Sequence, residues 1–235
     1  MALERGPDDP GRPARVDLHC HTRASFDGVA EPEALVERAT ARGLTHVAIT
    51  DHETLEGARR AAASAPAGIQ VLIGCEVNTP EGDLIFVFLE RALPKGLSAR
   101  EAIAAGREQG ALIGIPHPFD AARRSLLRDP ANEGLVALVD WVEAWNGRVA
   151  HRASNDRAAA LARRAGVPAI GVSDAHTLLE VGSVHTTMTG DPSTPAGLME
   201  ALHGELMIEG PVGTAARGRF SRLNRTGSRR AGATR

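Results

Sequence analysis

Apolar runs and segments with helical spacing alternate along most of the chain. Seven runs have the apolar, β-branched character of buried strands: 16–20, 46–50, 71–77, 84–89, 111–115, 141–145 and 169–172. Five other segments repeat apolar residues at helical spacing: 33–41, 55–63, 98–108, 153–164 and 196–203. Strands that alternate with helices in this way predict an α/β fold in which crossover helices join parallel strands.

Local signals mark several helix ends. Ser98 and Glu101 have the spacing of a capping box, which predicts that a helix begins directly after Ser98. Gly43, Gly110 and Gly166 each follow a predicted helix, where a left-handed residue commonly ends the last turn. These signals support the boundaries that the apolar spacing gives.

The predicted strands suit either a closed barrel or an open sheet. Five of the seven end in residues that suit chemistry: His19 and His21, Asp51 and His52, Glu76, His117, and Asp174 and His176. A closed α/β barrel collects its site from the carboxyl ends of many strands, whereas an open sheet gathers ligands mainly at one switch point. We therefore expect a TIM-like barrel over residues 15–213, with the site at the carboxyl ends of its strands.

Charge is distributed unevenly along the chain. The formal charge is −2, but the segment from Arg217 to Arg235 holds seven arginines and no acid, so the preceding residues carry −9. An acidic body argues against a nucleic-acid-binding surface on the fold, and the basic tail predicts at most a weak contact with nucleic acid. Because the two ends lack apolar spacing, we expect residues 1–14 and 214–235 to be disordered.

The chain shows no apolar run long enough to cross a membrane and no secretory signal, which predicts a cytoplasmic protein without a membrane contact. Its two cysteines, Cys20 and Cys75, fall on the first and third predicted strands. These strands lie about 9.6 Å apart when a middle strand separates them. That distance exceeds disulfide reach, so we expect both cysteines to be reduced and buried.

Two histidines stand one residue apart in the segment Asp-Leu-His-Cys-His-Thr at 17–22. Side chains alternate faces along a strand, so His19 and His21 point one way while Leu18 and Cys20 point the other. Two imidazoles on one face form the edge of a metal site. The polar residues that end the later strands supply further ligands.

Six motifs follow one another along the chain: Asp-x-His-x-His-Thr at 17–22, Ser-x-Asp-Gly at 25–28, Thr-Asp-His at 50–52, Gly-x-Glu at 74–76, Pro-His-Pro at 116–118 and Ser-Asp-x-His at 173–176. In this order they resemble the PHP (polymerase and histidinol phosphatase) domain family, from Val16 to the helix that includes His203. The resemblance implies a distorted seven-stranded (β/α) barrel whose two or three metal ions hydrolyse phosphoesters.

The resemblance also implies a set of metal ligands. It assigns His19, His21, Glu76 and Asp174 to a first ion, Glu76 and His117 to a second, and Asp27, His52 and His176 to a third. Many members have a further histidine where this chain has Asp83. Asp83 replaces that ligand, or Glu90 at the end of the same strand replaces it, or the site holds only two ions. The predicted catalytic residues are Glu76, His117, Asp174 and Glu143.

The types of ligand indicate the metal and the reaction. Imidazoles and carboxylates without a thiolate suit Zn, Mn or Fe better than Mg. Ions about 3.5–4 Å apart allow a bridging hydroxide to form near neutral pH and attack phosphorus in line. We therefore expect a metal-dependent phosphoesterase for a small phosphorylated metabolite or nucleotide. The alternatives are another metal-dependent hydrolase reaction, such as amide or phosphonate cleavage, and a non-catalytic metal-stabilised module that docks RNA or a protein through its basic tail.

Two residues at the end of the sixth predicted strand are further candidates. Glu143 and Asn146 are placed to contact substrate or bound water, with a capping or loop role as the alternative. Asp51 is expected to orient His52 or its loop, as carboxylates behind a metal ligand do.

Arginines are candidates for binding the substrate phosphate, because a guanidinium matches two phosphate oxygens. Arg148 and Arg23 are predicted in this role, and Arg123 and Arg124 form a further candidate pair. A solvent-exposed surface position is the alternative for each of them in a chain this rich in arginine.

Overall fold

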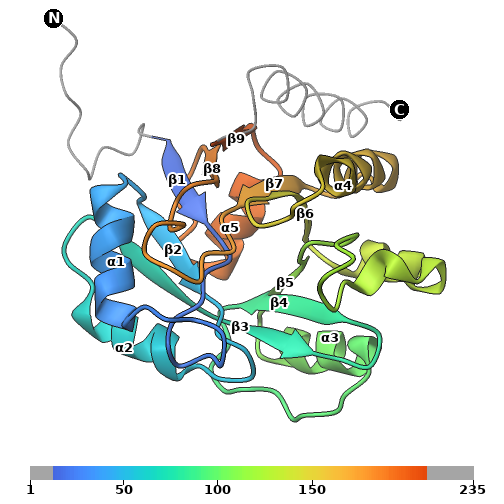
Figure 1. The fold of residues 1–235 in the computed structure, drawn as a ribbon, viewed down its shortest axis with the longest axis horizontal. Coiled ribbons are helices and arrows are strands. Elements are labelled where there is room, and N and C mark those ends of the chain that lie inside the picture. The colour runs from blue at the N-terminus through green and yellow to red at the C-terminus, as the bar shows by residue number, and fades with distance from the viewer. Residues whose placement is uncertain (1–12, 211–235) are drawn as a thin grey trace, which may run out of the picture.

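A computed structural model describes residues 13–210 of the chain. Nine strands form one sheet: β1 (Ala14–Asp17), β2 (His46–Ile49), β3 (Gln70–Asn78), β4 (Asp83–Val87), β5 (Leu112–Ile115), β6 (Trp141–Asn146), β7 (Ala169–Val172), β8 (His185–Met188) and β9 (Leu206–Glu209). Their order across the sheet is β7-β6-β5-β4-β3-β2-β1-β8-β9. The sheet curls into a nearly closed barrel (Figure 1). Apart from residues 13 and 14, the two terminal segments predicted to be disordered lie outside the described residues, and Ala14 begins β1.

The five predicted helices are confirmed to within a residue or two: α1 (Pro32–Ala41), α2 (Glu56–Ser64), α3 (Ala99–Glu108), α4 (Arg152–Ala165) and α5 (Pro195–Leu202). Short 3-10 helices, which were not predicted, occupy Leu126–Arg128 (η1) and Pro130–Leu138 (η2). The capping box at Ser98 and Glu101 is present. The glycines that follow α1, α3 and α4 have the left-handed backbone expected of them. The start of α3 and the ends of α1, α3 and α4 were therefore predictable from local signals.

The prediction of seven strands was wrong, and the parallel strands expected from the alternation are accompanied by antiparallel ones. β3 and β4 form an antiparallel hairpin through a turn at 79–82, and β4 is also antiparallel to β5. β8 and β9 were not predicted; they pair antiparallel with each other across a connection that contains α5, and β8 is also antiparallel to β1. β8 reads His-Thr-Thr-Met and lacks an apolar run, so spacing of apolar residues does not reveal it.

The barrel closes where β7 meets the β8–β9 pair, and here side chains replace a ladder of backbone hydrogen bonds. The Gly171 amide of β7 donates to Oγ1 of Thr186 on β8 (2.8 Å), and this hydroxyl donates to the Gly171 carbonyl (2.9 Å). A β-carbon at position 171 would lie 2.4 Å from Cγ2 of Ile208 on β9. Glycine is therefore required for β9 to approach β7 this closely.

The barrel interior is a packed apolar core. One buried cluster takes a side chain from every strand, including Val16, Leu72, Trp141 and Leu206, and adds residues of α5 such as Leu198. α1 and α2 cover the outside of β1–β3, α3 lies beside β4 and β5, and α4 lies beside β6 and β7 (Figure 1). α5 instead packs against this interior cluster through Leu198, Ala201 and Leu202.

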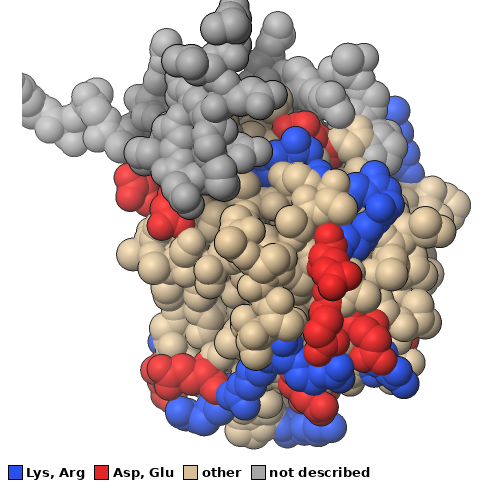
Figure 2. Space-filling model, turned by 90° about the vertical axis from the view of Figure 1, so that its left-hand side faces the viewer, with Lys and Arg blue, Asp and Glu red and all other residues tan. Residues whose placement is uncertain are grey.

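Charges of both signs are interspersed on the face that carries α1 and α2 (Figure 2). Arg60 of α2 pairs with Glu33 of α1 and with Glu31 at 3.0 and 3.1 Å. Cys20 and Cys75 are both unpaired and buried, as predicted. Between residues 13 and 210, no helix combines the length and the apolar character that a membrane crossing requires.

Candidate metal centre

The nine residues predicted to bind metal all lie at one end of the barrel. Each belongs to at least one of four overlapping groups of three residues whose ligand atoms lie within 4.8 Å of one another. The groups are His19, His21 and Glu76; His21, Asp174 and His176; His21, Asp27 and His52; and Glu76, Asp83 and His117. The prediction that strand ends converge is therefore matched by the geometry of the side chains.

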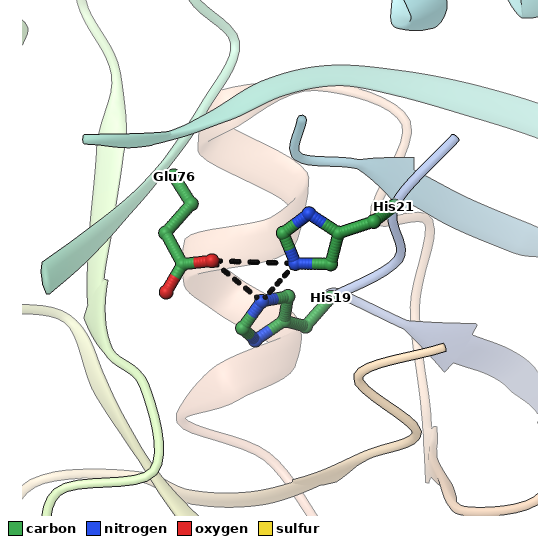
Figure 3. Close-up of side chains that lie close together, drawn as sticks. All are labelled: His19, His21 and Glu76. Carbon is green, nitrogen blue, oxygen red and sulfur yellow. Dashed lines mark hydrogen bonds and ion pairs between the residues drawn. The ribbon is translucent and has the colours of Figure 1, made fainter. Parts of the chain in front are cut away.

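The centre of the site is formed by His19, His21 and Glu76 (Figure 3). Both histidines follow the end of β1, and Cys20 between them makes a bridge to Ala175, which keeps the backbone extended. The two Nε2 atoms lie 2.8 Å apart, and each lies 3.2 Å from Oε2 of Glu76 on β3. Three ligand atoms therefore point at one small volume.

Glu76 joins this centre to a second group. Its other oxygen, Oε1, lies 3.2 Å from Nε2 of His117, which follows β5. Asp83, the first residue of β4, completes the group. A carboxylate that faces a different set of ligands with each oxygen has the arrangement of a bridge between two ions.

A third group lies between the loop after β1 and the loop after β7. Oδ2 of Asp27 lies 2.9 Å from Nε2 of His176 and 3.3 Å from Nε2 of His52. Asp174 faces the central histidines, with Oδ1 at 3.6 Å from His19 and 3.7 Å from His21. The sequence separation between these loops is large, so the barrel itself brings them together.

Electrostatics favour a cation at this end of the barrel. Burial opposes ionisation of Glu76, yet the surrounding imidazoles hold its pKa well below the ordinary value. Burial lowers the pKa of His21 to about 4, which leaves its ring neutral and able to donate a lone pair. Burial also opposes a charge on His19, but the carboxylates of Asp174, Glu143 and Glu76 raise its pKa well above normal. Buried imidazoles and carboxylates in this field fit a divalent transition metal ion.

Glu143 and Asn146 lie behind the ligand candidates and do not line the pocket. Oε1 of Glu143 lies 2.7 Å from Nδ1 of His19, and its Oε2 accepts from the His117 amide at 2.8 Å. Asn146 Nδ2 donates to Glu143 (2.8 Å) and to Asp174 (2.9 Å). A carboxylate behind a histidine fixes the ring and its tautomer, so Glu143 is placed to orient ligands. Its predicted direct part in catalysis stays a prediction.

Two of the candidates adopt a backbone that ordinary residues avoid. His117 has φ 25° and Asp174 has φ 54°. Such left-handed conformations cost on the order of 1–3 kcal/mol each and cluster at functional sites. Ser125 supports the first turn, because its hydroxyl donates to the His117 carbonyl at 2.6 Å.

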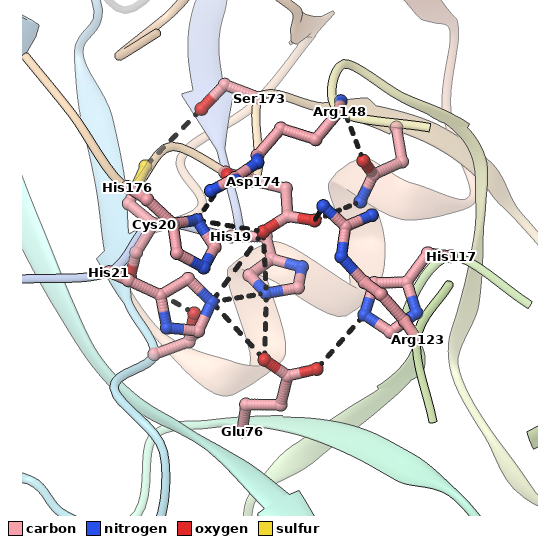
Figure 4. A network of polar contacts seen from close by, with 12 residues as sticks. His19, Cys20, His21, Glu76, His117, Arg123, Arg148, Ser173, Asp174 and His176 are labelled. Atoms are coloured by element: carbon pink, nitrogen blue, oxygen red, sulfur yellow. Dashed lines mark hydrogen bonds and ion pairs between the residues drawn. The ribbon is translucent and has the colours of Figure 1, made fainter. Parts of the chain in front are cut away.

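A pocket of about 180 Å³ opens above the site, and its walls include Asp83, Arg123 and Arg124. Nη2 of Arg123 lies 3.2 Å from Oδ2 of Asp174 (Figure 4). Nε of Arg124 lies 3.4 Å from Oδ1 of Asp83. The pair that the sequence offered as a further candidate for binding phosphate therefore forms part of the pocket wall.

The other two arginines do not line the pocket. Arg23 pairs with Glu31, and Nε of Arg148 lies 3.6 Å from Glu180. Their predicted binding of substrate stays a prediction. Asp51 accepts from the amide (2.6 Å) and hydroxyl (2.7 Å) of Thr22, so it supports the loop after β1, and its predicted orientation of His52 stays a prediction.

Strand direction separates the two alternatives for the position on β4. Because β4 runs antiparallel to β3, its first residue, Asp83, lies beside Asn78 at the site end. Glu90, beyond the other end of β4, is exposed, and its carbonyl accepts a hydrogen bond from Arg59. Asp83 lies within reach of the ligand candidates and Glu90 does not.

Sequence reasoning missed two residues of the pocket: Asn78, the last residue of β3, and Phe26. Phe26 lies in the Ser-Phe-Asp-Gly motif, and its ring stacks on the His52 ring at 4.8 Å between centroids. A signal was present in the sequence. Phe26 stands between the polar residues Ser25 and Asp27 of a loop motif, where no apolar core is available to bury its ring.

Comparisons with known proteins agree with this geometry. An uncharacterized protein of Methanocaldococcus jannaschii is 37% identical over 123 residues, which cover 48% of this chain and 72% of that protein. A 3',5'-nucleoside bisphosphate phosphatase of Chromobacterium violaceum is 36% identical over 124 residues, 47% of this chain but only 43% of the phosphatase.

The fold is also shared with a solved structure, a two-domain protein of Bacteroides vulgatus whose description names a predicted PHP-like metal-dependent phosphoesterase. The TM-score is 0.72 at 20% identity, covering 86% of this chain and 66% of that protein, slightly less than two thirds of its length. A PHP-associated family model matches residues 152–205. The PHP domain model matches residues 17–142, which is more than half of the chain, and the protein therefore belongs to the PHP domain family.

Proposed function

We propose that this protein is a metal-dependent phosphoesterase that hydrolyses a small phosphorylated molecule. One observation carries the proposal: four overlapping groups of imidazoles and carboxylates converge beneath a pocket whose wall includes two arginines. A metal ion held by these ligands would polarise a phosphoryl oxygen, and the guanidinium groups at the wall would donate hydrogen bonds to it.

The ligand atoms divide among two or three divalent ions, for which Zn, Mn or Fe suit the donor set. His19, His21, Glu76 and Asp174 would hold the first ion. Glu76, His117 and Asp83 would hold the second, and Asp27, His52 and His176 the third. When bound, such ions polarise a phosphoryl oxygen and lower the pKa of a coordinated water.

The remaining residues position the substrate and the ligands. Arg123 and Arg124 are placed to bind phosphoryl oxygens, because their guanidinium groups line the pocket beside Asp174 and Asp83. Glu143 and Asn146 hold the ligand side chains from behind. In the net reaction, water supplies the new P–O bond and a proton, the ester P–O bond breaks, and the alcohol leaves with that proton.

The relatives support the reaction class more firmly than the substrate. The phosphatase of Chromobacterium violaceum is named for a nucleoside bisphosphate, but the match spans less than half of that enzyme. The pocket volume of about 180 Å³ suits a phosphate and a small part of its leaving group. We therefore assign a small phosphomonoester as the substrate class.

The test uses the full chain, purified without chelator and supplied with Mn²⁺ or Zn²⁺. Elemental analysis should find at least two transition-metal ions per chain, and phosphate should be released from a panel of small phosphomonoesters. Metal removal should lower the melting temperature, because the ions join ligands from distant strands. Fewer than one ion per chain in metal-replete protein would contradict the metal site. Full metal content without phosphate release would favour the non-catalytic module.

A further inference from the structure

Phe26 is the one aromatic side chain that is strongly exposed among residues 13–210, at 85%. Other described aromatic residues, such as Phe86 and Trp141, are buried. Its ring stacks on His52 with an interplanar angle of 24°, and it forms part of the wall of the pocket. One face of the ring is therefore covered by a site histidine, and the ring remains largely open to solvent.

The exposure of Phe26 is built into the loop, because both neighbours are anchored. The Ser25 hydroxyl accepts from the His52 amide (3.1 Å) and donates to Oδ1 of Asp27 (2.9 Å). Asp27 in turn contacts His176. A β-carbon on Gly28 would lie 2.0 Å from the Thr22 carbonyl oxygen, so the loop folds tightly back on itself. These contacts hold the ring at the pocket and keep it from the core.

The aromatic ring and the arginines occupy different sides of the pocket. His52, on which Phe26 stacks, packs against His21 at 4.9 Å between ring centroids. His21 and His176 lie on one side of the site, whereas Arg123 lies beside His117 on the other (Figure 4). A bound molecule that spans the pocket therefore meets a flat apolar surface at one side and guanidinium groups at the other.

We propose that Phe26 stacks on the base of a nucleoside monophosphate, which makes small nucleotides the substrate class of the site. This inference rests on the proposed function. An aromatic side chain accepts any base because every base has a flat π face, and the stacking is worth about 1–3 kcal/mol per base. Loss of the ring should therefore weaken use of a nucleotide by about tenfold, equivalent to about 1.4 kcal/mol.

The experiment compares two esters in the Mn²⁺-loaded full chain: adenosine 5'-monophosphate and glycerol phosphate, which lacks a base. The measured quantity is the ratio of their kcat/KM values. Phe26→Ala should lower this ratio by about tenfold, Phe26→Tyr should retain it, and Phe26→Leu should lie near the alanine variant. The matched control is Leu179→Ala, since Leu179 is also an exposed apolar residue (79%) but does not line the pocket.

Binding is measured separately from turnover. In Phe26→Trp, the new indole should be quenched in a saturable way by a non-hydrolysable phosphonate analogue of adenosine monophosphate and not by glycerol phosphate. An unchanged ratio in Phe26→Ala, full retention in Phe26→Leu, an equal loss in Leu179→Ala, or no saturable quench would each overturn the stacking role. If the wild-type chain hydrolyses neither ester, the proposed function fails, while the quench still decides whether Phe26 binds a base.

Discussion

Parallel and antiparallel strands contribute different ends to the same site: the parallel strands their carboxyl ends, and the antiparallel strand β4 its amino end. β1, β2, β5 and β7 run toward the site, and their ligand candidates follow the last residue of each strand. β4 runs the other way and contributes its first residue, Asp83. β8, which is antiparallel to β1, and β9, which is antiparallel to β8, contribute no ligand candidate within residues 13–210 and close the sheet instead. Strand direction therefore decides which end of a strand can carry chemistry.

The largest effect is expected at the end of a parallel strand. His117→Asn should reduce turnover on the order of a hundredfold, because it removes a ligand of the second ion and with it a strong electrostatic stabiliser. The first ion keeps four other ligands, so circular dichroism should show a folded protein that has lost about one ion. His203→Asn, on an exposed residue after α5, is the matched control. An active His117→Asn variant with its metal intact would show that His117 is not a ligand.

A smaller effect is expected at Glu143, which contacts the proposed metal ligands from the side away from the pocket. Glu143 accepts from the His117 amide and from Asn146 and pairs with Nδ1 of His19, and a glutamine cannot satisfy all three with one carbonyl oxygen. Glu143→Gln should therefore weaken metal binding by about 10–100-fold, measured by titration against a competing chelator. Exposed Glu37 provides the control, Glu37→Gln. Unchanged affinity in Glu143→Gln would assign Glu143 to packing alone.

β4 offers a sharper test of the argument from strand direction, because the carboxylate residues at its start, Asp83, and beyond its end, Glu90, can be substituted separately. Asp83→Asn should reduce affinity for the second ion on the order of tenfold, because Glu76 and His117 still remain to bind it. Glu90→Gln should leave metal content and affinity within error. Equal effects of the two substitutions would break the argument from strand direction.

The smallest effect on catalysis is expected at the closure of the barrel. Thr186→Val removes the hydroxyl that bonds both the amide and the carbonyl of Gly171. Unfolding free energy should fall by about 1–3 kcal/mol, because buried backbone groups lose their partners. Thermal unfolding measures the loss, and turnover at 25 °C should stay within about twofold.

Thr187→Val is the control for this closure, since that hydroxyl bonds the partly buried Glu209. It should cost less stability than Thr186→Val. A large loss of turnover in Thr186→Val at a temperature where it remains folded would show that the closing strands help to shape the site.

Much of the site was readable because its residues follow apolar runs. The ends of the runs at 46–50, 111–115 and 169–172 placed His52, His117 and Asp174 correctly at one end of a barrel. The hairpin of β3 and β4 was also readable in principle. Parallel neighbours need a connection of a dozen residues or more, and only four residues separate these strands.

Other features depend on contacts between distant segments and leave no local pattern. β8 is polar, and its role arises only because Thr186 meets Gly171 across the closure. The contact of Arg123 with Asp174 joins two loops 51 positions apart. Sequence reasoning also placed Glu143 on the sixth strand without showing that its side chain lies behind His19.

The position of β1 between β2 and β8 has a consequence for how the chain is synthesised and folded. One edge of β1 stays without its neighbouring strand until β8, residues 185–188, has been synthesised. At about 5–20 residues per second, this occurs roughly 8–34 s after the synthesis of β1. His19 and His21 follow β1, and Asp174 and His176 lie shortly before β8 in the chain. During synthesis, the nascent protein therefore exposes its first two histidines long before it can assemble the complete set of ligand candidates, and we expect metal binding to be one of the last events of folding.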